Sequence, residues 1–330
     1  MNIIVKEYQS KDLDAVVALN RRLTDKWFHY TFIGEDLVKQ EEDSVNLLSN
    51  FEQWYHGGPW NNAQILKLYV ELVDLCQGKI FLAWNEYNEL VGEIDCCVAD
   101  NYNNRGYILW ILTDPNYRKQ GIGRQLIDHC VSFFKKNAIT SVIVIPEDEN
   151  AAIFYRNIGF VPHEKQIQVE ICTKNHIPLT TIIKKFSITP IFSYELVANG
   201  LLAMYPLIGS TGSNNYIVQT TLYREKIIEV LGWNIANNRF LPVLWRLKKG
   251  KLVAIFGNVY QLRVWVSQNA LMDEKFICDI FQCIKSLQVN TSHLDSLTFF
   301  LLEKDYKYIR NIDCKIIKEE LIYVLNEISQ

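Results

Sequence analysis

The spacing of apolar and polar residues predicts alternating strands and helices in the first half of the chain. Residues 3–9 alternate and carry β-branched side chains, which favours a strand. Residues 10–23 place apolar residues at helical spacing, with Ser10 as the expected cap. Strand patterns bounded by turn residues recur at 79–86, 90–100 and 106–113. We therefore expect three antiparallel strands here.

The following stretch combines both periodicities. Residues 121–138 have the apolar spacing of an amphipathic helix, and residues 141–148 form a short apolar run typical of a buried strand. A second helix is expected from Asn150, as its cap, to Gly159. The pattern as a whole predicts an α/β (α+β) fold with a mixed, mostly antiparallel sheet flanked by helices.

Residues 25–78 interrupt this order. The segment is acidic and aromatic, and it shows at least two helical patterns separated by the turn from His56 to Trp60. We expect it to be a helical insertion.

An internal echo predicts a second unit. Residues 141–169 resemble 296–324, and a tryptophan-containing strand pattern precedes each copy, at 107–113 and 262–268. We expect two domains of one fold, at 1–178 and 179–330, with the join near 176–185. Chance similarity of a helix and its flanking strands is the alternative.

Composition narrows the functional classes. A chain of 330 residues with 49% hydrophobic residues can bury two cores. Residues 25–100 carry fourteen acidic side chains against four basic ones, which disfavours nucleic acid as a partner. No apolar run approaches the roughly 20 residues of a membrane span, and we expect a cytoplasmic protein. The eight cysteines form no CxxC pair, and no His, Asp and Glu positions suggest a metal.

The stretch from Thr113 to Arg124 carries the clearest chemistry. It links a predicted strand to a predicted helix through Gly121 and Gly123, with Arg118, Lys119 and Arg124 around them. Free amides at a helix start, the helix dipole and glycines that allow close approach together favour a bound pyrophosphate. The sequence lacks the Gly-Lys-Ser/Thr that a nucleotide P-loop needs at this point, which excludes that class of site. A dinucleotide fingerprint needs a third small residue where Leu126 stands, so a Rossmann site is disfavoured as well.

The run Arg118-Lys-Gln-Gly121-Ile-Gly123 resembles the Arg/Gln-x-x-Gly-x-Gly/Ala signature of the GNAT acyltransferase superfamily. Asp114-Pro115 before it and Asn150-x-x-Ala-x-x-Phe-Tyr155-x-x-x-Gly159 after it are similar to the rest of that family's core. The similarity covers about residues 80–170. Because the internal echo repeats this order of elements, both domains are expected to be GNAT-like, each with a splayed sheet.

The resemblance implies acetyl-CoA as co-substrate and N-acetyl transfer to a primary amine by direct attack in a ternary complex. The backbone at 111–113 would hold the pantetheine arm, and the amide of Leu112 would polarise the thioester carbonyl. Asn150 matches the family's asparagine near that arm, although a helix cap explains it equally well. The expected cofactor-binding residues are Ile111, Leu112, Thr113, Arg118, Lys119, Gln120, Gly121, Ile122, Gly123, Arg124 and Asn150.

Acyl transfer to an amine needs a proton for the thiolate and a group that takes one from the amine. Tyr155 occupies the position of the family's proton-donating tyrosine, while a tyrosine in an amphipathic helix is otherwise a core residue. Glu93, with Asp95 on the same face of its strand, is the candidate base. Ordered water is the alternative.

The acceptor is expected to be a small-molecule or peptide amine. Acidic and aromatic residues of the insertion favour a cationic one, with the following as candidate lining residues: Glu41, Glu42, Asp43, Trp54, Tyr55, His56 and Trp60. Peptide N-termini, lysine side chains, aminoglycosides, polyamines and amino acids stay open, as do longer acyl groups and a homodimer.

The C-terminal copy departs from the pattern at its expected cofactor loop. Residues 266–274 contain no glycine pair and no basic cluster, and Tyr155 is replaced by Ile309 in the echo. We expect a degenerate domain without a pyrophosphate site. A non-catalytic acyl-CoA sensor is the main alternative function for the whole chain, and a structural or interaction protein is the third.

Overall fold

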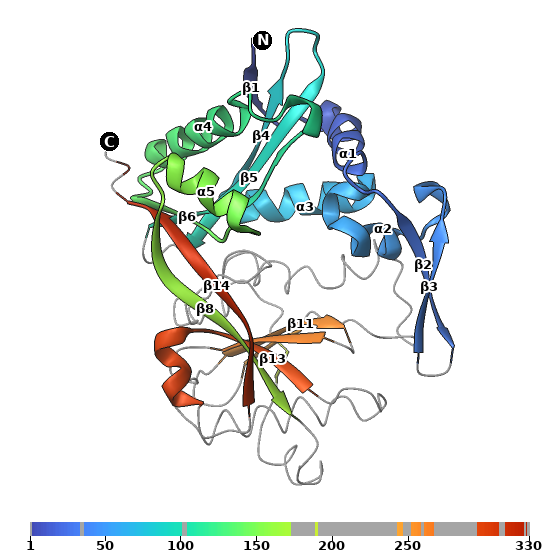
Figure 1. Cartoon of the computed structure of the whole chain (residues 1–330), viewed down its shortest axis with the longest axis vertical. Helices are drawn as coiled ribbons and strands as arrows, with labels where there is room; N and C mark the ends of the chain where they lie inside the picture. Colours follow the sequence, from blue (N-terminus) through green and yellow to red (C-terminus); the bar gives the residue numbers. More distant parts are fainter. Residues whose placement is uncertain are drawn as a thin grey trace.

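The fold is described from a computed structural model (Figure 1). It describes residues 2–33, 36–100, 104–172, 189–190, 243–246, 252–258, 261–266, 296–309, 314–326 and 328. The expected join near 176–185 and the C-terminal segment 267–274 lie outside these residues.

The predicted mixed, mostly antiparallel sheet is confirmed. Its order is β1-β4-β5-β6-β7-β14-β8-β13-β12-β11-β10-β9. The strands of the N-terminal half are β1 (Ile4–Glu7), β4 (Lys79–Trp84), β5 (Leu90–Asp100), β6 (Arg105–Thr113), β7 (Ser141–Val144) and β8 (Val161–Cys172). Those that follow are β9 (Thr189–Pro190), β10 (Val243–Arg246), β11 (Leu252–Asn258), β12 (Gln261–Val266), β13 (Ser296–Leu302) and β14 (Cys314–Leu325).

Helices cover both faces of the N-terminal part of this sheet. One core packs α4 (Ile122–Lys136) and α5 (Glu149–Asn157) against β4 to β7, with Phe134 and Tyr155 among its buried side chains. The other packs α1 (Leu13–Arg21) and α3 (Ala63–Leu75) against the opposite face, around Leu19, Leu66 and Leu112. The apolar stripes read from the sequence are the faces that these helices bury.

The prediction of a wholly helical insertion at 25–78 is wrong for its first part. Residues 27–42 form a two-stranded antiparallel hairpin of β2 (Trp27–Ile33) and β3 (Asp36–Glu42). The β2 sequence, WFHYTFI, consists of aromatic and β-branched residues that favour a strand over a helix. The two expected helices are present as α2 (Asn50–Gly57) and α3, and the short 3-10 helix η3 (Pro59–Asn61) lies between them.

Strand β6 changes partners along its length. It pairs with β5 from end to end, but with the parallel β7 only at Arg105, Gly106 and Tyr107. Asp95 of β5 faces Trp110 whereas Cys96 faces Ile108, so Leu109 is the extra residue of a β-bulge. From Ile108 to Thr113, no described strand pairs with β6 on the β7 side. The two parallel strands therefore part just before the bulge.

The two halves of the echo exchange strands. β14 lies between β7 and β8, and β8 in turn pairs with β13. The first half contains β7, α5 and β8 in this order. The second contains β13, the 3-10 helix η7 (Glu303–Tyr308) in the place of α5, and β14. Antiparallel then parallel pairing also recurs, in β5-β6-β7 and β11-β12-β13. The domain boundary at 178 stays a prediction.

Two predicted helix caps are wrong. The cap of α5 is Asp148, whose carboxylate accepts from the amide of Ala151 at 2.8 Å, and Asn150 is an exposed residue of the first turn. Ser10 opens the 3-10 helix η1 (Ser10–Asp12), where the Asp12 carboxylate accepts from the Gln9 amide at 2.9 Å. A carboxylate thus takes the capping position of α5, whereas η1 has Gln9 as its N-cap and Asp12 as its third residue.

Gly106 is required by the packing of α4 on the sheet. A Cβ at this position would lie 2.5 Å from the ring of Phe134, a fully buried side chain. We expect Gly106→Ala to lower the free energy of unfolding by about 1–3 kcal/mol, measured by urea denaturation. Phe134→Leu should relieve the overlap, so that the double variant loses less than the sum of the two single variants. Strict additivity would contradict this packing.

Candidate active site

The segment between β6 and α4 is fixed by contacts on both sides. Asp114 begins the 3-10 helix η4 (Pro115–Tyr117), and its Oδ1 accepts from the amide of Asn116 at 3.0 Å. Its Oδ2 lies 2.9 Å from the Arg22 guanidinium, just beyond the end of α1. The Tyr117 hydroxyl donates to Glu89, in the β4–β5 turn, at 2.8 Å. These bonds hold the start of the glycine loop to α1 and to the sheet.

The start of α4 is left open by its own sequence. Gly121 is the N-cap in the left-handed conformation (φ 80°), and as a glycine it gives no side-chain capping bond. The first turn closes with Gln125 N donating to Gly121 O at 3.1 Å, so the amides of Ile122, Gly123 and Arg124 precede any intrahelical bond. Nothing lies within 4 Å of the Cβ that Gly121 lacks. The helix end thus offers uncapped amides to open space.

The basic side chains expected at this loop lie on the surface. Arg118, Lys119 and Arg124 are exposed, as are Gln120 and Gly121. Arg118 Nε donates to the carbonyl of Thr113 at 3.4 Å, and Arg124 Nε lies 3.8 Å from Asp128 one turn along α4. Lys119 has a positive φ of 62°, a conformation that costs energy outside glycine. Positive charge and free amides therefore occur together at this loop, a combination suited to a phosphate group.

Tyr155 is held in the core below the helical layer. It is 3% exposed, and its ring contacts those of Phe154 and Phe160 edge to face at 5.3 Å. Burial raises the pKa of Tyr155, and the nearby Cys130 adds to the effect. The phenol consequently stays protonated at neutral pH. None of the described residues forms a hydrogen bond with its hydroxyl. Asn150 lies on the exposed first turn of the same helix.

Glu93 and Asp95 lie on the opposite face of the sheet and are both fully buried. Asn20 Nδ2 of α1 donates to Glu93 Oε2 at 2.8 Å. Asp95 Oδ2 accepts from Trp60 Nε1 at 2.7 Å and from the Tyr69 hydroxyl at 2.8 Å. Burial and the neighbouring Asp95 raise the pKa of Glu93 well above its usual range. Burial also raises the pKa of Asp95 to about 7, although its hydrogen bonds oppose the shift.

Aromatic side chains from three elements surround Asp95. Trp60 of η3 stacks on Trp110 of β6 with ring centroids 4.6 Å apart, and it meets Tyr69 of α3 edge to face at 5.2 Å. Trp110 faces Asp95 across the β5–β6 pair, beside the bulge. Of the insertion residues expected to line the acceptor pocket, Trp60 donates a hydrogen bond to the buried carboxyl of Asp95.

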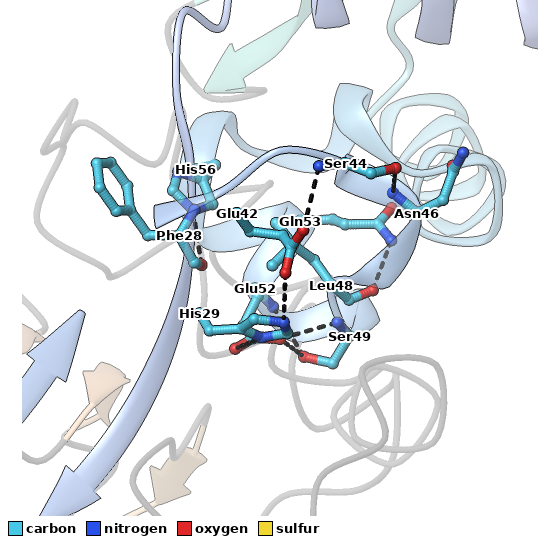
Figure 2. Close-up of polar contacts among 10 residues, drawn as sticks. All are labelled: Phe28, His29, Glu42, Ser44, Asn46, Leu48, Ser49, Glu52, Gln53 and His56. Carbon is cyan, nitrogen blue, oxygen red and sulfur yellow. Dashed lines mark hydrogen bonds and ion pairs between the residues drawn. The ribbon is translucent and has the colours of Figure 1, made fainter. Parts of the chain in front are cut away.

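His56 and Glu42 have another role in this arrangement (Figure 2). His56 Nε2, at the end of α2, accepts from the amide of Phe28 in β2 at 2.8 Å. His29 lies between two carboxylates, 3.1 Å from Glu52 of α2 and 3.4 Å from Glu42 of β3. These contacts fasten the hairpin to α2.

The described residues show no other reactive centre. Within them, no group of three or more His, Cys, Asp or Glu side chains could hold a metal ion. Four of their cysteines, at 76, 96, 97 and 130, are buried free thiols, and Cys314 is a half-buried one. Over the same residues, no helix has the length and apolarity needed to cross a bilayer.

Three residues of the carboxyl site were not predicted. Asn20 is polar at a position four residues after the buried Val16, and this break in an apolar stripe was a usable signal. Tyr69 and Trp110 fit the apolar pattern of α3 and β6. Periodicity therefore shows neither the hydrogen bond of Tyr69 to Asp95 nor the position of Trp110 opposite Asp95. Long-range pairing, not local sequence, brings them together.

The comparisons with known proteins point to one family. Residues 76–162 match the family model of the acetyltransferase (GNAT) domain. A search of curated proteins gives no match.

Solved structures similar over nearly the whole chain include three GCN5-related N-acetyltransferases. The one from Anabaena variabilis has a TM-score of 0.58 at 10% identity, covering 98% of this chain and 72% of that one. The one from Kribbella flavida has 0.55 at 11%, covering 98% and 70%. The one from Sphaerobacter thermophilus has 0.51 at 10%, covering 99% and 96%. At such identities the similarity shows the fold alone.

We expect the capping bond of Asp114 to stabilise the loop more than the ion pair between Asp114 and Arg22 does. Asp114→Ala removes both the cap of η4 and the partner of Arg22, and should cost about 1–3 kcal/mol of unfolding free energy. Arg22→Gln leaves the bond between Asp114 and Asn116 in place and removes a half-exposed cation. This variant should therefore lose less than about 1 kcal/mol of unfolding free energy. Chemical denaturation of both variants decides this, and equal losses would contradict the capping role.

Proposed function

Because the chain carries a GNAT acetyltransferase domain at residues 76–162, we propose that it transfers an acetyl group from acetyl-CoA to a primary amine by direct attack in a ternary complex. The observation that carries the proposal is the open start of α4 beside the edge of β6 that β7 leaves unpaired. Acyl transfer is the chemistry of this family.

The pyrophosphate of coenzyme A fits the start of α4. The uncapped amides from Ile122 to Arg124 would donate to it, and Arg118, Lys119 and Arg124 would offset its charge. The open space at Gly121 lets phosphate oxygens approach the backbone. Gln120 and Asn150, both exposed, are further proposed contacts of the cofactor.

The pantetheine arm fits the free edge of β6. From Ile108 to Thr113, backbone groups on the β7 side have no strand partner among the described residues, and an amide-containing chain can pair with them as a strand would. In the proposed complex, Ile111 and Thr113 hold the arm and the Leu112 amide donates to the thioester oxygen, where negative charge develops during attack.

Tyr155 is the proposed acid. Acetyl-CoA supplies the activated acyl group and a thiolate leaving group. The Tyr155 hydroxyl gives its proton to that sulfur, and its ring packing against Phe154 and Phe160 fixes the direction of the phenol. Burial keeps the phenol protonated at neutral pH, so that a proton is available for the departing thiolate.

The Glu93–Asp95 pair is the proposed proton acceptor. Glu93 lies directly across from Leu112 in the β5–β6 ladder, so the pair belongs to the strand next to the one that would hold the thioester. A carboxyl group that titrates near neutrality can take the proton that an amine must lose to become a nucleophile. The acidic insertion favours a cationic acceptor, and the cytoplasm is the proposed location.

A non-catalytic acyl-CoA sensor would use the same loop but needs no acid. The buried phenol of Tyr155 favours the enzyme, because a sensor needs no proton donor and none of the described residues forms a hydrogen bond with this hydroxyl. Turnover separates the two readings.

Gly121→Glu tests the loop. The carboxylate would fill the open space at the helix start and repel the pyrophosphate, so the Kd for acetyl-CoA should rise by at least about tenfold, or 1.4 kcal/mol. Gly121→Asn is the matched control, since asparagine tolerates a positive φ and adds no charge; it should lose less affinity. Calorimetric titration measures both, and unchanged binding by Gly121→Glu would contradict the assignment.

Tyr155→Phe tests the acid. We expect kcat to fall about 10²–10⁴-fold with little change in the KM for acetyl-CoA, measured by thiol release with whichever primary amine of a panel supports turnover. Thermal unfolding is the control, because the hydroxyl has no bond to lose among the described residues and the melting temperature should hold. Undiminished kcat would exclude Tyr155 as the proton donor.

A further inference from the structure

Among the residues that the structure describes, no cation pairs with the buried carboxyls of β5. Glu93 and Asp95 stand two residues apart on one face of the strand, and both are 0% exposed. The groups that act on them are Asn20 of α1, Trp60 of η3, Tyr69 of α3 and each other. None of these described neighbours is basic, and the other titratable groups nearby, Tyr8 and Cys96, are neutral at physiological pH. Two bare negative charges could not be held here.

The unpaired oxygens show where a proton belongs. Glu93 Oε1 and Asp95 Oδ1 are both buried, and neither has a hydrogen-bond partner among the described residues when both groups are ionised. An interaction between the two side chains contributes to the raised pKa of Glu93. Two acceptor oxygens can share a hydrogen bond only if one of them carries a proton. A single proton between the groups satisfies both oxygens and leaves one negative charge on the pair.

The remaining donors decide which group is ionised. Asp95 Oδ2 accepts two hydrogen bonds, from the Trp60 indole and the Tyr69 hydroxyl, whereas Glu93 Oε2 accepts one from Asn20. Hydrogen bonds to the charged form of a group stabilise that form. The negative charge is therefore better stabilised on Asp95 than on Glu93. Burial raises the pKa of both groups, which agrees with a proton retained on the pair.

We propose that Glu93 holds the shared proton and donates it to Asp95 Oδ1, and that the ionised Asp95 is the vacant proton position of the acceptor site, which selects amines that arrive as cations. In the step it serves, an N–H bond of the ammonium breaks and an O–H bond forms on Asp95, with the proton passing through ordered water because the carboxyl itself is fully buried. The positive and negative charges cancel, and the neutral amine is left to attack. This deepens the role given to the pair and rests on the proposed function only for that step.

Infrared spectroscopy of the resting protein tests the proton position without any substrate. At about pH 9, ordinary carboxyl groups are ionised, and a protonated carboxyl stretch should remain. Glutamate labelled with carbon-13 at the side-chain carboxyl should shift this band, and labelled aspartate should not. Glu93→Gln should abolish it, because the glutamine amide replaces the donated proton, while Asp95→Asn should keep it.

The opposite labelling result would overturn the proposal, as would the absence of any band. Labelling needs no substitution, so the test survives even if a variant fails to fold. Unfolding free energy gives a second check: since the pKa of Asp95 is raised, its contribution is full below the ordinary carboxyl pKa and is lost as pH rises toward about 7. Asp95→Asn should make that slope shallower without removing it, because Glu93, whose pKa is also raised, still contributes.

Turnover then tests the catalytic consequence separately. Asp95→Asn should lower kcat more than Glu93→Gln does and should raise the KM for the amine rather than for acetyl-CoA. The pH dependence of kcat/KM should shift in Asp95→Asn. A correct proton position with equal effects of both variants on kcat would refute the selection of cationic amines and leave the proton assignment standing. Absence of turnover in the unaltered protein would instead refute the proposed function.

Discussion

Strands β6 and β7 run parallel but pair over three residues, and most features of the site depend on that early separation. Backbone amides and carbonyls that lose a sheet partner must find another. The bulge at Leu109 turns β6 at this point and places two successive side chains, Leu109 and Trp110, on the face of α1 and α3. The bulge thus lies next to the edge of β6 that β7 leaves unpaired, and it positions Trp110 opposite Asp95.

The helices on the two faces divide the chemistry between them. On one face, α4 brings an uncapped N-terminus and surface cations to the end of β6, and α5 brings a buried phenol. On the other, α1 and the insertion supply Asn20, Trp60 and Tyr69 to a pair of carboxyls. Burying two carboxyls costs folding free energy unless a proton and several donors accompany them. Their presence is better explained by use than by stability.

The sequence predicted the elements that depend on local pattern. The three strands before the loop, the long helix after it and the uncapped helix start at Gly121 follow from apolar periodicity and from a glycine at a helix start. The hairpin at 27–42 was mistaken for helix because the acidic composition outweighed the strand-like run of β2. Asp148 was missed as a cap since Asn150 stood in a similar local setting. Contacts across distant segments, such as Tyr69 with Asp95 and β14 between β7 and β8, leave no local trace.

The most direct measurement of the central claim is mass spectrometry of a mixture of primary amines incubated with acetyl-CoA and the purified protein. The account predicts that at least one amine gains a single acetyl group, with release of an equal amount of coenzyme A thiol, and that cationic amines react before neutral ones. Tight acetyl-CoA binding without acetylation of any amine, across the classes from polyamines to peptide N-termini, would contradict it and favour a sensor.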